Sequence, residues 1–169
     1  MIYFDMATIK KKKVVVVINY RQSLGKMIKD GNYDSVQQFI NSKNFLIKGT
    51  GQQKREIFLI NFGQKILQRK VVDYMKKNNL RPVVIEELVA VGNQYPKIQG
   101  QSAVCALGTI FHCRQYPMKG MVFFPLIDRV KSISGITRNL LLFDYDPDYQ
   151  FRDKTTRFAA VSTLVEHTK

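Results

Sequence analysis

The segment KKKKVVVVI, Lys10–Ile18, combines the two properties on which the rest of this sequence depends. Four valines and an isoleucine follow one another without a polar interruption. β-Branched residues favour extended backbone, and a continuous apolar run of this length is typical of a buried strand. Four lysines stand directly before the run. The segment therefore predicts an inner strand that is entered from a strongly basic stretch.

Helices are expected at four places downstream. Ser23 is a suitable N-cap for a short helix that ends at Lys29, and Asp34 could cap another over residues 35–40. The strongest signal is Ile66–Lys77, where apolar residues recur at helical spacing and the other face is basic. A further helix is expected over Val84–Val91, opened by Pro82.

Strands are expected over residues 54–62, 103–112, 121–127, 139–143 and 157–163. The short connections between the later strands imply an antiparallel meander. The polar connection 129–138, which carries Ser and Gly, is expected to be a mobile loop. Together the elements predict a single α+β domain over residues 14–165, preceded by a flexible basic arm at residues 1–13. Its meander-rich antiparallel sheet would be covered on one side by the helices Ile66–Lys77 and Val84–Val91.

Composition sets further bounds on the class of protein. The chain has 169 residues, of which 45% are hydrophobic, so it can bury the core of one domain. Only two cysteines are present, which argues against a disulfide-rich secreted scaffold and favours reduced thiols in a cytoplasmic protein. No purely apolar run is longer than the five residues of Val14–Ile18, which is too short to cross a bilayer, so no membrane partner is expected.

The formal net charge is +14, and it is unevenly distributed. Residues 1–81 contain 17 Lys or Arg and 5 Asp or Glu, whereas residues 82–169 contain 10 and 8. Such asymmetry is typical of a protein with one surface that meets a polyanion. General solubility is the alternative explanation, because net charge bears on partners and not on fold.

Three segments carry a resemblance to a known pattern. They are LRPVVIEELVAVG (Leu80–Gly92), followed by Tyr95-Pro96; AVCALG (Ala103–Gly108); and RFAAV (Arg157–Val161). This LRP…EEL…YP…ALG…RFAAV pattern resembles an uncharacterised family of bacterial or phage proteins. The resemblance implies an α+β fold and carries no activity. The chain is more basic than that family, and it has Phe111, Phe143 and Tyr145 where the family is rich in Trp.

The leading functional hypothesis is non-catalytic binding of single-stranded nucleic acid, with RNA slightly preferred over DNA and little sequence specificity. Lysines and arginines on one surface would neutralise phosphates and release counterions, and aromatic side chains would stack on bases. The candidate residues are Lys10, Lys11, Lys12, Lys13, Lys54, Arg55, Lys65, Arg69, Lys70, Tyr74, Lys76, Lys77 and Tyr116. Phe58 and Phe111 are weaker stacking candidates, because such residues more often fill a core.

Other kinds of site receive less support. Three aspartates in Asp144–Asp148 could hold a divalent cation and so make a nuclease, but acidic turns are common and the remaining ligands of a calcium loop are missing. Cys105 and Cys113 would lie about 26 Å apart on one strand, too far for a shared zinc ion. No cofactor, catalytic residue or metal ligand is predicted. The main alternative function is a module that docks on an acidic protein partner, in an oligomeric state that the sequence does not define.

Overall fold

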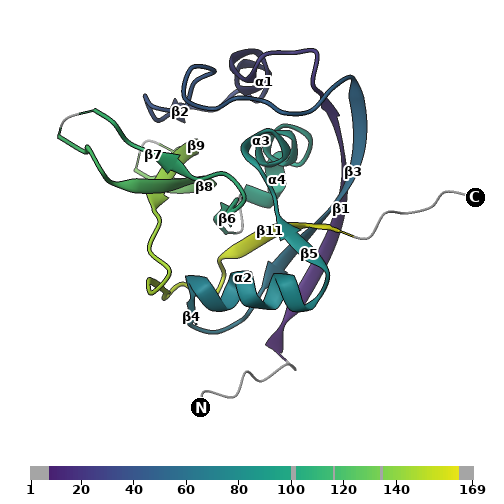
Figure 1. Ribbon diagram of the computed structural model, residues 1–169, viewed down its shortest axis with the longest axis vertical. Helices are drawn as coiled ribbons and strands as arrows, with labels where there is room; N and C mark the ends of the chain where they lie inside the picture. The colour runs from purple at the N-terminus through teal and green to yellow at the C-terminus, as the bar shows by residue number, and fades with distance from the viewer. Residues whose placement is uncertain (1–7, 100–101, 116, 134, 164–169) are drawn as a thin grey trace, which may run out of the picture.

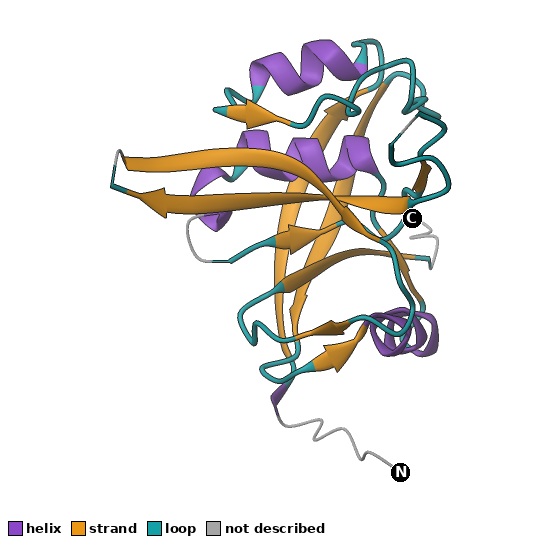
Figure 2. Cartoon of the chain, turned by 90° about the vertical axis from the view of Figure 1, so that its left-hand side faces the viewer, coloured by secondary structure: helices purple, strands orange, loops and turns teal. Residues whose placement is uncertain are grey.

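The computed structural model describes residues 8–99, 102–115, 117–133 and 135–163. These residues form a nine-stranded sheet and a separate two-stranded ladder (Figures 1 and 2). The main sheet runs in the order β1 (Lys10–Asn19), β3 (Gln52–Asn61), β11 (Arg157–Ser162), β6 (Val104–Cys105), β8 (Val122–Ser132), β9 (Gly135–Asp144) and β2 (Ser35–Val36). β5 (Leu80–Pro82) also pairs with β11, β7 (Phe111–His112) pairs with β8, and β4 (Ile66–Leu67) pairs with β10 (Gln150–Phe151).

The architecture is α+β, as the sequence predicts, but the sheet is mixed. β11 and β6 run parallel, as do β2 and β9, whereas the other pairs are antiparallel. A meander is therefore present only in part, over β7, β8 and β9, and within it β8 and β9 form a long hairpin. The parallel pairings join segments far apart in the chain, so the short connections visible in the sequence give no sign of them.

Helices lie on both faces of the sheet. α3 (Ile85–Gln94) packs with α1 (Leu24–Asp30) and α4 (Pro96–Gln99) in the space enclosed by the curved sheet, whereas α2 (Gln68–Lys77) covers the opposite face (Figure 1). The expectation that both main helices share one side is wrong. β5 lies between them in the chain and pairs with β11, so the chain crosses from one face to the other there.

The lysines of β1 belong to the sheet. Lys10 pairs with Asn61 and Lys13 with Phe58 in an unbroken ladder with β3, so the predicted flexible arm does not extend to Lys13. The valines alternate as a strand requires, with Val14 and Val16 buried and Val17 exposed. The four lysines repel one another, but their backbones pair with β3 and their ammonium groups are exposed to solvent.

The outer edge of β1 is closed by side chains from the end of α3. The Gln94 amide accepts from Val17 N–H at 3.0 Å and donates to Val17 C=O at 2.7 Å. The Tyr95 hydroxyl similarly accepts from Val15 N–H at 3.3 Å and donates to Val15 C=O at 2.8 Å. These contacts pair backbone groups that would otherwise be unpaired at an open edge of the sheet. Lys10 to Lys13 precede this part of β1, and their charges hinder pairing with a strand of another molecule.

Three segments differ from the secondary structure expected. Residues 35–40 form β2 and turns instead of a helix, because they bond to the edge of β9: Gln37 N–H donates to Leu140 C=O, and the Gln37 side chain accepts from Leu142 N–H. The Asp34 carboxylate, expected as a helix cap, accepts from Arg138 N–H at 2.6 Å. Tertiary pairing therefore overrides the local capping signal.

The expected strand over residues 103–112 is divided into β6 and β7. Gly108 lies between them, and a Cβ there would fall 2.5 Å from the carbonyl oxygens of Pro82 and Val83. The expected mobile loop 129–138 instead forms the outer part of the β8–β9 hairpin, which projects from the body of the protein (Figure 2). Val130 and Ile136, which belong to this part, are exposed. The sequence here therefore lacks the pattern of a half-buried strand.

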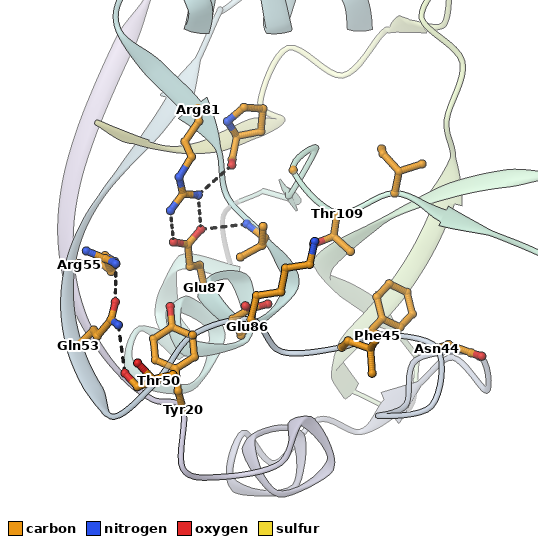
Figure 3. A pocket seen from close by; sticks show the side chains of 17 residues that line it. Tyr20, Asn44, Phe45, Thr50, Gln53, Arg55, Arg81, Glu86, Glu87 and Thr109 are labelled. Carbon is orange, nitrogen blue, oxygen red and sulfur yellow. Dashed lines mark hydrogen bonds and ion pairs between the residues drawn. The ribbon is translucent and has the colours of Figure 1, made fainter. Parts of the chain in front are cut away.

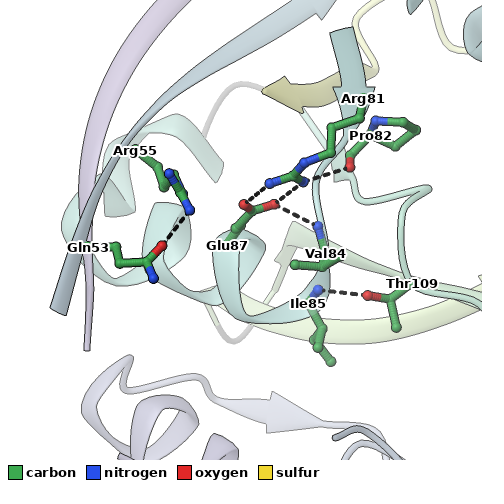
Figure 4. A network of polar contacts seen from close by, with 8 residues as sticks. All are labelled: Gln53, Arg55, Arg81, Pro82, Val84, Ile85, Glu87 and Thr109. Carbon is green, nitrogen blue, oxygen red and sulfur yellow. Dashed lines mark hydrogen bonds and ion pairs between the residues drawn. The ribbon is translucent and has the colours of Figure 1, made fainter. Parts of the chain in front are cut away.

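α3 is the most enclosed element, because Ile85 to Gly92 are all buried. Glu87 lies in its first turn with no exposed surface, and its carboxylate accepts two hydrogen bonds from Arg81 of β5, at 2.8 and 2.6 Å. It also accepts from Val84 N–H at 2.9 Å (Figure 4). One carboxylate thus neutralises a guanidinium and caps the helix, which fixes α3 to β5.

Replacing Arg81 by Leu is predicted to lower the free energy of unfolding by about 3 kcal/mol, because the Glu87 charge loses its partner inside the protein. Adding Glu87→Gln should recover part of the loss, since the amide oxygen still accepts from Val84 N–H and no charge remains. Urea unfolding of Arg81→Leu and of the double variant measures both changes in the free energy of unfolding. The interpretation is wrong if Arg81→Leu unfolds like the wild type, or if the two substitutions destabilise additively.

Candidate nucleic-acid interface

Three neighbouring strands bring basic side chains together at one end of the sheet, where β1 and β11 begin and β3 ends. In the register, Asn61 of β3 lies opposite Lys10 of β1 on one side and Arg157 of β11 on the other. Residues paired across antiparallel strands project on the same face. Lys10, Asn61 and Arg157 therefore lie abreast on the face that α3 covers farther along the sheet.

The Asn61 amide adds the connection between β10 and β11 to this group. Its Nδ2 donates to the backbone oxygens of Lys154 at 2.7 Å and Thr156 at 3.0 Å. These two hydrogen bonds hold the connection against the end of β3. Lys154 and Thr155, which are distant from β1 in the sequence, thereby lie beside its lysines.

The result is a hollow of about 380 Å³, which we call the basic hollow. Its lining residues are Lys10, Lys11, Lys12, Leu59, Asn61, Lys154, Thr155 and Arg157. Five of these eight are Lys or Arg and none is acidic. The nearby Asp153 carboxylate accepts from the backbone and hydroxyl of Thr155, each at 2.8 Å, and so stabilises its own turn. The hollow is consequently a concentrated region of positive potential.

Lys11 connects the basic hollow to α2. Its ammonium lies 5.3 Å from the centroid of the Tyr74 ring, within the range of a cation–π contact. Lys70 and Lys77 are exposed and lie one helical turn from Tyr74 on the same side of α2. Positive charge therefore continues from the hollow across this helix.

The remaining predicted residues divide into several groups. Lys54 and Arg55 lie at the other end of β3, about 20 Å from Asn61 at the usual rise per residue. Lys65 and Lys76 are exposed but contribute no side chain to the hollow. Lys13 pairs with Glu56 at 2.9 Å, and Arg69 pairs with Asp148. Tyr116 lies outside the described residues.

The aromatic candidates are largely engaged in packing. The Tyr74 ring is half-buried, with its edge-to-face contact on Phe62 at 5.2 Å. Phe111 packs among Phe39, Phe45 and Phe123, and Phe58 is half-buried against the core beside α2. A base that stacked on Tyr74 would have to displace the Lys11 ammonium.

Asn61, Lys154 and Arg157 line the basic hollow but are not among the residues predicted from the sequence. Their contribution depends on strand register and on the Asn61 amide contacts, neither of which leaves a local pattern. The segment Lys154-Thr-Thr-Arg157, with a basic residue at each end, is the one sequence signal for this group, and such segments are common in turns. Charge in the second half of the chain therefore contributes more to the surface than its near-neutral balance suggests.

The acidic turn at Asp144–Asp148 and the two cysteines have the following surroundings in the structure. The acidic turn is organised by protein contacts, with Asp146 accepting from Asp148 N–H and Asp148 paired to Arg69. Across the described ranges, no group of three or more His, Cys, Asp or Glu is arranged to hold a metal ion. Cys105 and Cys113 are buried free thiols, and burial raises the pKa of Cys105. No helix in the described part of the chain is long and apolar enough to cross a membrane.

Comparison of the chain with protein-family models, curated proteins and solved structures gives no match. The residues of the LRP…EEL…YP…ALG…RFAAV pattern nevertheless have identifiable places in the fold. Arg81 and Glu87 form the ion pair at the start of α3, Tyr95 closes the edge of β1, and Gly108 packs on β5. Each contact holds elements together, so the pattern itself indicates no chemistry.

The exposed Arg69–Asp148 pair is predicted to contribute little to stability. Asp148→Asn should change the free energy of unfolding by less than about 0.5 kcal/mol, because both side chains are more than half exposed and water screens their attraction. Thermal and urea unfolding can verify this. A loss of several kcal/mol would show that the contact between α2 and the acidic turn is structurally essential.

Proposed function

We propose that the protein binds single-stranded nucleic acid without catalysis, by holding phosphates in the basic hollow. The observation that carries the proposal is a lining in which five of the eight residues are Lys or Arg and none is acidic. Exposed ammonium groups bind phosphate electrostatically and release condensed counterions. Arg157, half-buried at the start of β11, adds a further positive charge to the lining.

The position of the hollow favours a single strand over a duplex. It is a small concavity at the end of three strands, and the positive surface continues onto one short helix. Such a surface can follow a narrow, flexible backbone. Phosphate contacts carry no sequence information, so little sequence specificity is expected. The Asn61 amide oxygen and the Thr155 hydroxyl oxygen can accept from sugar hydroxyls, since their donor hydrogens are used within the protein, and this is the basis for preferring RNA.

Fluorescence anisotropy with labelled oligo(U) and oligo(dT) tests the proposal. For the wild type, the logarithm of the association constant should fall with the logarithm of salt concentration, with a slope of about −3.5 if all five cations contact phosphates. The variant Lys10→Gln/Lys12→Gln/Lys154→Gln should bind about tenfold or more weakly and lose about 2 from that slope.

A matched control separates the hollow from net charge. Lys29→Gln/Lys43→Gln/Lys97→Gln removes the same charge from exposed positions elsewhere and should retain most of the affinity. Equal losses in both triple variants would contradict a defined site. Undetectable binding of either oligonucleotide at low salt would end the proposal, and binding of polyglutamate instead would support the acidic-partner alternative.

A further inference from the structure

A second and larger cavity lies at the opposite end of β3, beside the start of α3 (Figure 3). Its volume is about 810 Å³, within the range typical of small-molecule sites. The start of α3, the connection between α1 and β3, β5, and the turn around Gly108 enclose it. The cavity shares no lining residue with the basic hollow.

Close backbone packing fixes the walls of this cavity. A Cβ at Gly49 would lie 2.1 Å from the Tyr20 ring, so the connection can approach the ring because it has glycine there. Gly108 approaches the carbonyls of β5 in the same way. Phe45 and Ile110 supply an apolar side, and Leu46, which is 75% exposed, extends it at the rim. The cavity is therefore formed by the fold itself.

The cavity contains a cation without an acidic partner. Arg55 is half-buried, and its Nη2 donates to the neutral Gln53 side chain (Figure 4). Among the described residues no carboxylate forms an ion pair with Arg55, because Glu87 is already paired with Arg81. Lys48, exposed at the same cavity, adds a second positive charge. Partly buried cations of this kind attract an oxyanion.

Glu86 presents an acceptor in the same cavity. The residue is 5% exposed, and no side chain in the described part of the chain forms an ion pair with its carboxylate. Burial raises the pKa of Glu86, the nearby backbone N–H groups of Glu86 and Lys48 oppose the rise, and the neighbouring Glu87 charge adds to it. A carboxylate has about four acceptor positions, so it has capacity for a donor from a ligand.

Tyr20 lies between these charges. Burial raises the pKa of its hydroxyl, with the Glu87 and Glu86 charges contributing in the same direction and Arg55 opposing them. The hydroxyl is thus neutral and able to donate at physiological pH. The cavity consequently offers cations, a neutral hydroxyl, a carboxylate and an apolar wall.

We propose that this cavity binds a small organic anion, with its oxyanion at Arg55 and Lys48, a hydrogen-bond donor at Glu86, and its apolar or planar body against Phe45 and Ile110. The oxyanion is a phosphate monoester or a carboxylate, and nucleoside monophosphates combine all the required groups. This site is separate from the basic hollow and does not rest on the function proposed for it.

Thermal unfolding and isothermal titration calorimetry with defined probes test the proposal. AMP and CMP should raise the melting temperature of the wild type in proportion to the logarithm of their concentration, whereas adenosine, which lacks the oxyanion, should raise it less. Inorganic phosphate and glutamate, at matched ionic strength, distinguish a phosphate from a carboxylate as the preferred group. Saturable binding by either class of organic anion supports the site.

Variants locate the binding. Arg55→Gln should abolish the shift, and Lys48→Gln, at an exposed position that should not affect folding, should weaken binding about fivefold. Lys154→Gln in the basic hollow should leave anion binding unchanged, whereas Lys48→Gln should leave oligonucleotide binding unchanged. The proposal fails if no organic anion binds the wild type. It also fails if Lys48→Gln binds the organic anion as tightly as the wild type does while Lys154→Gln loses that binding.

Discussion

The ion pair between the partly exposed Arg81 and the buried Glu87 is the contact on which the fold depends. α3 is buried from Ile85 to Gly92 between the curved sheet and α1, so the polar groups of its first turn need partners within the protein. Glu87 accepts from Arg81 and from Val84 N–H, and Thr109 accepts from Ile85 N–H. Because Arg81 belongs to β5, the same contact ties the helix to the centre of the sheet.

The fold distributes positive charge into two separate regions with different surroundings. The ends of β1, β3 and β11 form the basic hollow, whose lysines are exposed to solvent and whose lining has no acidic residue. At the other end of β3, Arg55 is half-buried in a larger cavity that also has carboxylates and an apolar wall. Exposed lysines suit a long, flexible polyanion, whereas the mixed lining of the larger cavity suits one small ligand. One strand therefore supplies residues to two sites of different chemistry.

Much of the local structure could be predicted from the sequence, because it depends on local causes. The valine run, the Ser23 cap of α1 and the amphipathic pattern of α2 all correspond to elements of the expected type. The errors occur where distant partners decide the outcome: Asp34 bonds to β9, and Gly108 packs on β5. The basic hollow was visible only in part, since Lys10–Lys12 are a sequence run but Arg157 joins them through strand register.

Mapping of backbone amide shifts in the ¹⁵N-labelled protein, titrated with oligo(U), tests the central claim most directly. Phosphate binding in the basic hollow predicts progressive shifts at Lys10 to Lys12, at Asn61 and over Lys154 to Arg157, and these shifts should diminish as salt is added. Shifts that are absent there and concentrated at the β8–β9 hairpin or around α1 would contradict it.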